Sequence, residues 1–314
     1  MLKYIINRVL QAIPTLFIVI TVSFFLMRLA PGGPFDGERP LPPEIEANLK
    51  QAYGLDKPLL VQYGLYLDNL AHGDLGPSFR DKDHTVNEQL SQGLPASVAI
   101  GLCAMALALA LGLPLGILAA LRRNRFTDYV IMGAALGGIA LPNFVLAPLM
   151  AVFFGIVLRL LPVSGWPSVG DSVLSYAWYM TLPVIALSIQ QIAYIARMMR
   201  ASMIEVMGQP FIRTAQAKGL STSRVILRHA LRPALLPILS YLGPAITSII
   251  TGSVVIEKIF AVPGIGAHFV EGATNRDYTL VMGTVVLYAA LIIAMNLLVD
   301  VLYSLLDPQV RYRS

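Results

Sequence analysis

Six uninterrupted apolar runs restrict how this chain can fold more than any other feature. They cover residues 9–30, 97–121, 130–158, 179–199, 234–256 and 280–305. Roughly 20 helical residues cross a bilayer core, so each run is long enough to form a transmembrane helix. Only 13% of the residues are charged, against 56% that are hydrophobic, which excludes an ordinary soluble domain and nucleic-acid binding. Because the runs lack a two-residue alternation, we predict an all-α polytopic membrane protein with six transmembrane helices.

Basic residues predict which side of the membrane each segment faces. The N-terminus, the segments that follow the second and fourth runs, and the C-terminus together hold fourteen basic residues and three acidic ones. The long loop at 31–96 instead holds ten acidic residues and five basic ones. The positive-inside rule therefore predicts that both termini are cytoplasmic and that loop 31–96 lies outside.

This orientation divides the chain into segments with different expected roles. Residues 9–30 are expected to remain as the first transmembrane helix, since their apolar stretch is too long for a typical signal peptide. Loop 31–96 shows helical patterns at 43–52 and 59–70, which indicates a small folded periplasmic cap rather than a linker. The predicted divisions are an interfacial cytoplasmic helix at 1–8, the first span at 9–30, the cap at 31–96, a transmembrane core at 97–305 and a cytoplasmic tail at 306–314.

The inner segment at 203–233 predicts two short helices joined by a glycine turn. Pro210 can begin the first helix, since its missing N–H needs no partner there. Gly219 stands where a left-handed residue would end that helix, and Ser221 can cap a second helix at 222–231. Small side chains at Ala215 and Ala217 would let a partner protein come close. The alternative is a basic loop that only sets the topology and contacts lipid headgroups.

The octet at 213–220 resembles the EAA loop of ABC importer permeases, whose pattern is Glu-Ala-Ala, three residues, then Gly. Ala215 and Gly219 match the pattern, whereas Arg213 and Thr214 replace its Glu and first Ala. The form Arg-Thr-Ala-x-Ala-Lys-Gly-Leu is similar to the peptide branch of that family. Further stretches similar to this branch are Pro31-Gly32, Gly73-Asp74-Leu75-Gly76, Leu141-Pro142-Asn143-Phe144, His229-Ala230-Leu231-Arg232, Pro263-Gly264-Ile265-Gly266, Asn275-Arg276-Asp277-Tyr278 and Asp307-Pro308. In the cap, Gly37-Glu38-Arg39 and Leu41-Pro42-Pro43-Glu44 are similar to the B-type permease subunits of oligopeptide importers.

The resemblance implies the type I ABC importer permease fold and a bacterial inner-membrane location. The implied partners are a homologous second permease subunit, two cytoplasmic ABC ATPases, a periplasmic peptide-binding protein, a peptide substrate and the lipid bilayer. The helix at 211–219 is implied to be the coupling helix that docks in a groove of one ATPase. The residues expected to carry this coupling are Phe211, Arg213, Thr214, Ala215, Ala217, Lys218, Gly219 and Leu220.

No site for a cofactor or for catalysis is expected in this chain. It lacks the Gly-x-x-x-x-Gly-Lys-Ser/Thr motif, so ATP and Mg²⁺ are expected on the partner ATPases. A metal site is not predicted either, because His72, His84 and His268 are expected to be exposed histidines without partners. Asp277 and Arg276 are expected to shape an outer turn.

Neutral polar residues within the spans are candidates for lining a passage for a peptide. Adjacent Gln190 and Gln191 point in different directions, so at least one should face away from lipid. The alternative is that such residues hydrogen-bond between helices, each contributing about 0.6 kcal/mol. Pro142 and Pro244 are candidate hinges, with plain packing as the alternative. The candidate lining residues are Asn143, Gln190, Gln191, Thr247, Ser248 and Thr251.

These observations predict the permease subunit of an ATP-driven importer for oligopeptides. Related permeases carry dipeptides, glutathione or nickel chelates, and these cargoes remain alternatives. An ion-driven transporter would need ionisable residues deep in the spans. An intramembrane enzyme would need a nucleophile beside a base. The spans provide little support for either.

Overall fold

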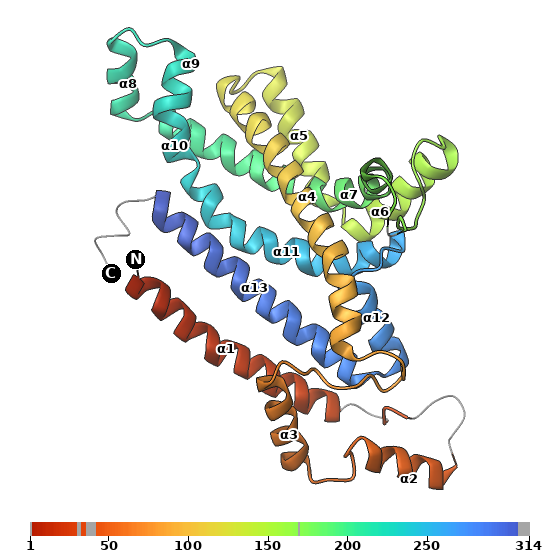
Figure 1. Cartoon of the computed structure of the whole chain (residues 1–314). Coiled ribbons are helices and arrows are strands. Elements are labelled where there is room, and N and C mark those ends of the chain that lie inside the picture. Colours follow the sequence, from red (N-terminus) through yellow and green to blue (C-terminus); the bar gives the residue numbers. More distant parts are fainter. Residues whose placement is uncertain (1, 30–32, 36–41, 169, 307–314) are drawn as a thin grey trace. The chain divides into compact units, whose positions relative to one another are not determined.

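The computed structural model describes residues 2–29, 33–35, 42–168 and 170–306. The described chain is almost entirely helical, and its elements follow one another as shown in Figure 1. The longer helices are α1 (Leu2–Leu29), α4 (Val86–Leu121), α7 (Val173–Met207), α11 (Leu236–Phe260) and α13 (Tyr278–Leu306). The shorter elements are α2 (Pro43–Ala52), α3 (Leu59–Ala71), α5 (Phe126–Ala140), α6 (Asn143–Met150), α8 (Pro210–Ala217), α9 (Thr222–Val225), α10 (Leu231–Ala234), α12 (Ile265–Asn275) and two π-helices, η1 (Ala151–Val157) and η2 (Ile226–Ala230).

The apolar runs form the helices that the sequence predicts, with one exception. The five longer helices are each long and apolar enough to cross a membrane, which confirms five of the predicted runs. The run at 130–158 is broken into α5 and α6–η1, which are bent by 102° relative to each other and make a sixth span if the pair crosses the membrane as one. One helical segment was predicted there, and it is interrupted because Pro142 disfavours a helical conformation at Leu141, whose backbone is extended.

The ends of the chain differ from the expected divisions. A separate interfacial helix at 1–8 was predicted, but α1 runs without a break from Leu2 to Leu29. The apolar residues that begin at Val9 continue the same helical ladder, so nothing separates the two segments. Residue 30, the resemblance motifs at 31–32 and at 37–41, and the tail at 307–314 lie outside the described residues.

The described residues divide into two compact units. Unit 1 contains the described parts of Met1–Val9, Val98–Val262 and Ile292–Ser314, and unit 2 those of Leu10–Ser97 and Pro263–Leu291.

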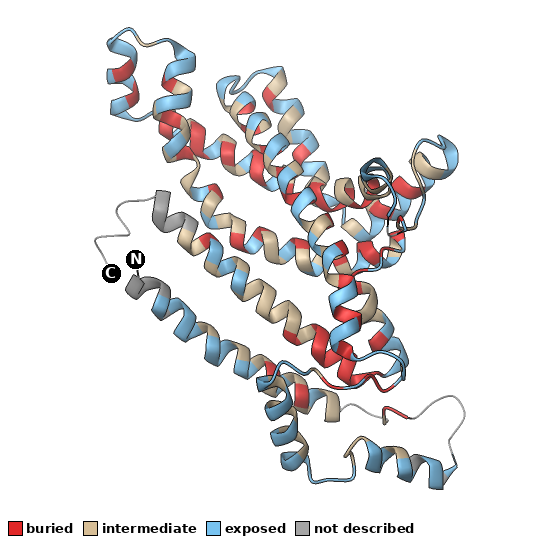
Figure 2. Cartoon of the chain, in the orientation of Figure 1, coloured by how far each residue is buried: buried red, intermediate tan, exposed pale blue. Residues whose placement is uncertain are grey.

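Close helix packing holds unit 1 together around α7. A Cβ atom on Gly116 of α4 would lie 2.5 Å from the Ala196 carbonyl oxygen, and one on Gly112 would lie 2.8 Å from an Ile195 methyl carbon. The spacing of these two glycines is the Gly-x-x-x-Gly pattern that lets membrane helices approach closely. Figure 2 shows the resulting buried residues along α7.

An ion pair joins α5 to α7 in the same unit. Both carboxylate oxygens of Asp128 accept hydrogen bonds at 2.6 Å from the Arg200 guanidinium, and Asp128 is buried. The Asn124 N–H donates to the same carboxylate at 2.9 Å. Such a fork-to-carboxylate pair fixes the relative orientation of the two helices.

Unit 2 combines residues 10–29 of α1 with the cap, the start of α4, α12 and the first turns of α13. The predicted cap helices are confirmed as α2 and α3. Tyr63 on α3 forms a 2.6 Å hydrogen bond with Thr21 on α1, and its ring packs 5.2 Å from that of Phe24. Phe35, Phe79 and Tyr278 form a buried aromatic cluster beneath the cap. The cap is therefore a folded part of the unit.

Candidate functional site

The inner segment folds into a short rigid helix, α8, followed by a glycine turn. Pro210 occupies the first helical position, as the sequence predicts. Gly219 has φ +78°, and a Cβ atom added to it would meet no other atom within 4 Å. The left-handed conformation, rather than a lack of space, is therefore what favours glycine at this position.

Two backbone hydrogen bonds close the end of α8. The Gly219 N–H donates to the Gln216 carbonyl at 2.9 Å, and the Leu220 N–H donates to the Ala215 carbonyl at 3.4 Å. This pair is the Schellman arrangement, which needs a left-handed residue after the helix. Leu220 packs against the same hydrophobic cluster as Ala215. The turn is thereby fixed by backbone bonds and by packing together.

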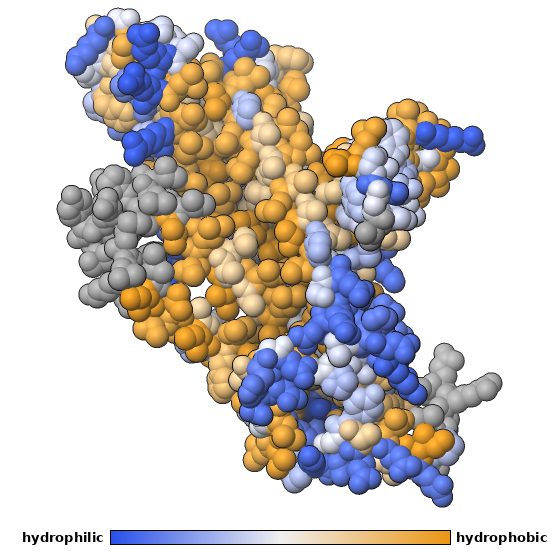
Figure 3. Space-filling view, in the orientation of Figure 1, coloured by the Kyte–Doolittle hydropathy of each residue, from blue (hydrophilic) through white to orange (hydrophobic). Residues whose placement is uncertain are grey.

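The faces of α8 differ sharply in burial. Ile212 and Ala215 are buried in the hydrophobic core of unit 1, together with Met203 and Val225. Ala215 was expected to let a partner protein come close, and this expectation was wrong, since Ala215 is buried within the chain. It lies three positions after Ile212 and therefore on the same buried helix face. Figure 3 shows hydrophilic side chains gathering over α8 and α9. The exposed coupling residues are Phe211, Arg213, Thr214, Ala217, Lys218 and Gly219.

The second predicted helix, at 222–231, is present but not uniform. It consists of α9, the π-helix η2 and α10, which lead into α11. Pro233 has no N–H to donate to the His229 carbonyl, so an unbroken α-helical ladder is not available here. Ser221 is the N-cap residue, but its side chain makes no capping hydrogen bond to the described residues.

The first candidate passage residues surround the break between α5 and α6. The Gln190 side chain donates to the Leu141 carbonyl at 3.5 Å, and this carbonyl directly precedes Pro142. Asn143 begins α6, and its buried Oδ1 finds no partner among the described residues. Pro142 therefore stands at the 102° bend, beside the side-chain amides of Gln190 and Asn143.

Gln191 is placed differently from its neighbour. It is 2% exposed, and its Oε1 accepts a 2.9 Å hydrogen bond from the Tyr241 hydroxyl on α11. Gln191 therefore makes a hydrogen bond between helices, which was the predicted alternative to lining a passage. Helical geometry turns adjacent residues by about 100°, which explains why Gln190 is only half-buried beside it.

The α11 candidates form an exposed stripe. Pro244, Ser248 and Thr251 are all exposed and are spaced at four and three residues, so they share one helix face. Thr247 is half-buried, and its hydroxyl donates to the Gly243 carbonyl of its own helix. Pro244 lies inside a continuous helix. In this conformation the α11 backbone therefore has no break there.

The residue that sequence reasoning undervalued is Asp277. It is 1% exposed, and its carboxylate accepts hydrogen bonds from the Ser78 hydroxyl, the Phe79 N–H at 3.2 Å and the Thr279 hydroxyl at 2.9 Å. Asp277 thus shapes the turn between α12 and α13, and it also ties the cap to the start of α13. A contact between residues about 200 positions apart leaves no local trace in a sequence.

His72 and His84 are exposed, as expected, but both have partners, and His72 Nδ1 lies 2.8 Å from the Asp68 carbonyl oxygen. His84 Nδ1 lies 2.9 Å from an Asp81 oxygen, and this hydrogen bond raises the pKa of His84. The pKa of Asp81 is lowered by a hydrogen bond from the Asp83 N–H and by its bond to His84. His268 is partly buried, and burial lowers its pKa. Within the described ranges, no three His, Cys, Asp or Glu residues are placed to hold a metal ion.

Comparison with known proteins identifies the chain's relatives over its whole length. Residues 112–312 match the family of binding-protein-dependent transport system inner membrane components, and residues 1–101 match the N-terminal part of such membrane components. The oligopeptide transport system permease protein OppB is 53% identical in Haemophilus influenzae and 54% identical in Escherichia coli K12, each over 99% of this chain and 100% of the relative. The dipeptide transport system permease protein DppB of Bacillus subtilis is 44% identical over 99% of this chain and 98% of its own.

A solved structure shares the fold at low sequence identity. The MetNI methionine ABC transporter, in an inward-facing conformation, matches with a TM-score of 0.59 and 16% identity, covering 70% of this chain and 96% of that chain. This likeness confirms the predicted type I importer permease fold, and the family match together with the apolar helices confirms a multi-pass membrane protein. With family matches along most of its length and relatives above 50% identity, the chain belongs to the binding-protein-dependent transport system inner membrane components.

Proposed function

We propose that this chain is one of two membrane subunits of an ATP-driven importer that carries oligopeptides across the bacterial inner membrane. The observation that carries the proposal is 53–54% identity to oligopeptide permease proteins over 99% of the chain. The dipeptide permease relatives are less similar, at 44% and 38%. The chain is a transport component, and the proposed partner ATPases bind ATP and Mg²⁺ and hydrolyse the nucleotide.

The proposed partners are a homologous second permease, two cytoplasmic ATPases and a periplasmic peptide-binding protein. We assign the ATPase contact to the exposed face of α8, which carries Phe211, Arg213 and Lys218. The opposite face is buried in unit 1 through Ile212 and Ala215. Because α8 is packed on one side and capped by a fixed turn, force on its exposed face would reach α7 and α11 as a rigid-body motion.

The proposed cycle needs different partner affinities in its two states. ATP binding closes the ATPases, α8 moves with them, and the spans on either side of it tilt so that the passage opens toward the loaded binding protein. Hydrolysis then resets the complex. A ligand shifts such an equilibrium only by its difference in affinity for the two states. Gln190 and the α11 stripe are the proposed contacts for the peptide backbone.

Co-purification through a tag on this chain tests the assignment. We expect two Walker-type ATPases and a second permease to accompany it, and the binding protein loaded with an oligopeptide to stimulate ATP hydrolysis. Longer peptides should stimulate more than dipeptides. Isolation of the chain without any ATPase, under conditions that keep the membrane complex intact, would contradict the proposal.

Cysteine cross-linking tests the role of α8 directly. The exposed native Cys103 is first replaced by serine to remove background. Ala217→Cys should then cross-link to an ATPase subunit, since Ala217 is exposed whereas Ala215 is not. Ser164→Cys is the matched control, because it is exposed in a loop predicted to face outward. Labelling of Ala217→Cys from outside intact cells by an impermeant thiol reagent would overturn the predicted orientation.

A further inference from the structure

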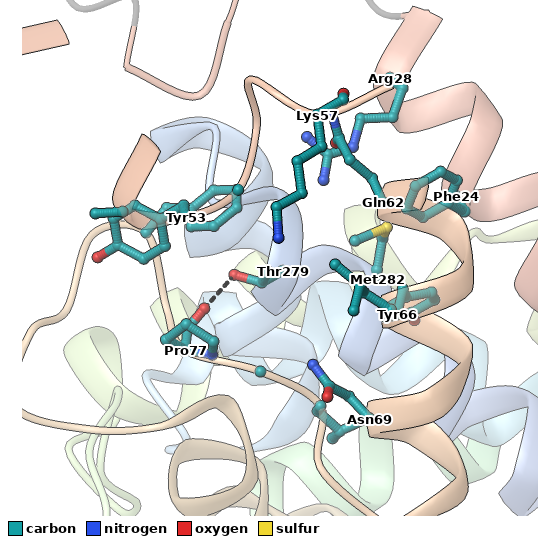
Figure 4. A pocket seen from close by; sticks show the side chains of 16 residues that line it. Phe24, Arg28, Tyr53, Lys57, Gln62, Tyr66, Asn69, Pro77, Thr279 and Met282 are labelled. Carbon is teal, nitrogen blue, oxygen red and sulfur yellow. Dashed lines mark hydrogen bonds between the residues drawn. The ribbon is translucent and has the colours of Figure 1, made fainter. Parts of the chain in front are cut away.

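A polar cavity in unit 2 has no role in the mechanism proposed above. Its volume is about 320 Å³, and it lies between the outer end of α1, the α2–α3 segment and the first turn of α13. Figure 4 shows the side chains that surround it, with the Lys57 amine pointing into the space near Thr279. Aromatic rings of Phe24, Tyr53 and Tyr66 form much of its wall.

The charged side chains that line the cavity are both basic. Arg28 and Lys57 both line it, and none of the described residues that line it is acidic. The Arg28 guanidinium carbon lies 5.3 Å from the centre of the Phe24 ring, which holds the side chain in place by a cation–π contact. Two uncompensated cations beside a half-enclosed space favour an anion there.

Three residues that line this space each have a buried polar atom without a partner. Arg28 Nε, Gln62 Oε1 and the Tyr66 hydroxyl find no hydrogen-bond partner among the described residues. Buried polar groups are satisfied in the great majority of native structures, so a set of three around one cavity points to a bound polar molecule.

The chemistry of these atoms specifies more than a negative charge. Gln62 Nε2 donates to the Leu55 carbonyl at 3.1 Å and to the Lys57 carbonyl at 2.7 Å, which fixes the amide so that its oxygen is an acceptor. Burial raises the pKa of Tyr66 to about 12, so its phenol keeps the proton and can donate. A ligand should therefore offer both an anionic oxygen for the cations and a hydroxyl for Gln62.

The surface beside the cavity is apolar. Leu26 and Leu29 at the end of α1 are 62% and 75% exposed, and Leu65, which lines the cavity, is 44% exposed. Since α1 is one of the membrane-crossing helices, these leucines offer contact to acyl chains at the level of the headgroups.

We propose that this cavity binds the headgroup of an anionic phospholipid with free hydroxyls, of the phosphatidylglycerol type. Its phosphate lies between Arg28 and Lys57, a glycerol hydroxyl donates to Gln62 Oε1, and the acyl chains follow the exposed leucines of α1. Choline or ethanolamine headgroups bring a cation that has no acidic partner among the lining residues.

Photo-labelling tests this site on the full chain, purified with its accompanying subunits and placed in phosphatidylcholine nanodiscs. A photoreactive phosphatidylglycerol should attach to peptides that contain Leu65 or Met282, both of which line the cavity. Lys57→Gln and Arg28→Gln should each lower this labelling severalfold. Lys82→Gln, an exposed basic residue of the same loop outside the cavity, is the control and should leave it unchanged.

Competition identifies the source of the anion. Unlabelled phosphatidylglycerol should reduce the labelling, whereas millimolar inorganic phosphate should not. Loss of labelling in phosphate would assign the cavity to soluble anions and overturn the lipid. Equal labelling by a photoreactive phosphatidylcholine, or unchanged labelling in Lys57→Gln, would also overturn it. Lys57 is exposed, so its variant remains informative even if Arg28→Gln does not fold.

Discussion

The inner segment around α8 and the outer cap around Asp277 are held in place by different kinds of contact. The α8 segment depends on backbone geometry: a proline start, a left-handed glycine and close helix packing in the same unit. The cap has, besides its aromatic cluster, one buried carboxylate that accepts hydrogen bonds from a segment about 200 residues away in the chain. A segment that transmits force needs local stiffness, whereas a cap built from distant segments needs a polar junction that keeps them together.

The largest expected effect is the loss of the polar junction. Asp277→Asn can keep its amide oxygen for the Phe79 and Leu280 N–H groups, which donate to the same carboxylate oxygen. Its NH₂ group then meets the Ser78 hydroxyl, which donates to the other oxygen and therefore loses its buried acceptor. Hydrogen bonds to a charged group are each worth about 1.5–3 kcal/mol, and we expect a loss of roughly 3 kcal/mol. Limited proteolysis of the cap and thermal unfolding in detergent measure it.

Asp83→Asn is the control for that experiment, because Asp83 is an exposed carboxylate in the same loop. It should leave both the protease resistance and the melting temperature unchanged. If Asp83→Asn destabilised the cap as much as Asp277→Asn, any loss of negative charge would have this effect. The buried junction at Asp277 would then not distinguish the cap from the α8 segment.

Close helix packing should give the next largest effect. Gly116→Ala would place a methyl group 2.5 Å from a backbone oxygen of α7, which cannot move without shifting the helix. Overpacking costs about 1–3 kcal/mol, and we expect about 2 kcal/mol in thermal unfolding. Gly133→Ala on α5 is the control, since nothing lies within 4 Å of its added methyl group. A stable Gly116→Ala protein would mean that α4 and α7 separate easily.

The left-handed turn after α8 should give a smaller effect. Gly219→Ala also meets no atom within 4 Å, so its φ of +78°, rather than a steric clash, opposes the substitution. A left-handed conformation costs an L-residue about 1–2 kcal/mol. We expect about 1 kcal/mol of destabilisation and weaker peptide-stimulated ATP hydrolysis. Normal coupling in this variant would argue against α8 as a rigid connector.

The sequence predicted the inner segment better than the cap for a physical reason. Pro210, the glycine turn and the apolar runs act through neighbours in the chain, so their consequences follow from local rules. The inward direction of Ala215 depended instead on Ile212 and the core beneath it. The spacing of Gly112 and Gly116 was a visible pattern for close packing, although it does not name α7 as the partner.

The cap shows what local reasoning cannot supply. Its two helices were predictable from periodicity, and they occur where expected. The donors around Asp277, the partner of His84 and the cations of the polar cavity come together only after distant segments fold. Long-range polar contacts therefore mark the limit of prediction from one sequence.

The smallest expected effect concerns two histidines of unit 2, whose pKa values should move in opposite directions. The hydrogen bond that His84 donates to Asp81 raises the pKa of His84 above its ordinary value of 6.5, whereas burial lowers that of His268. Titration of ¹³C-labelled histidine by NMR should show His84 losing its proton at the higher pH. Asp81→Asn should return the His84 midpoint toward 6.5 and leave that of His268 in place.

The directions of these two pKa shifts determine how each histidine affects stability as the pH changes. The contribution of His84 to stability is fully present below pH 6.5 and is lost as the pH rises through its raised pKa. His268 behaves in the opposite way, because its neutral form is favoured by burial, and its contribution is lost as the pH falls through its lowered pKa. If both histidines titrated near pH 6.5, the polar contacts of unit 2 would not be held in a fixed geometry. The proposed difference between the cap and the α8 segment would then lose its support from the cap.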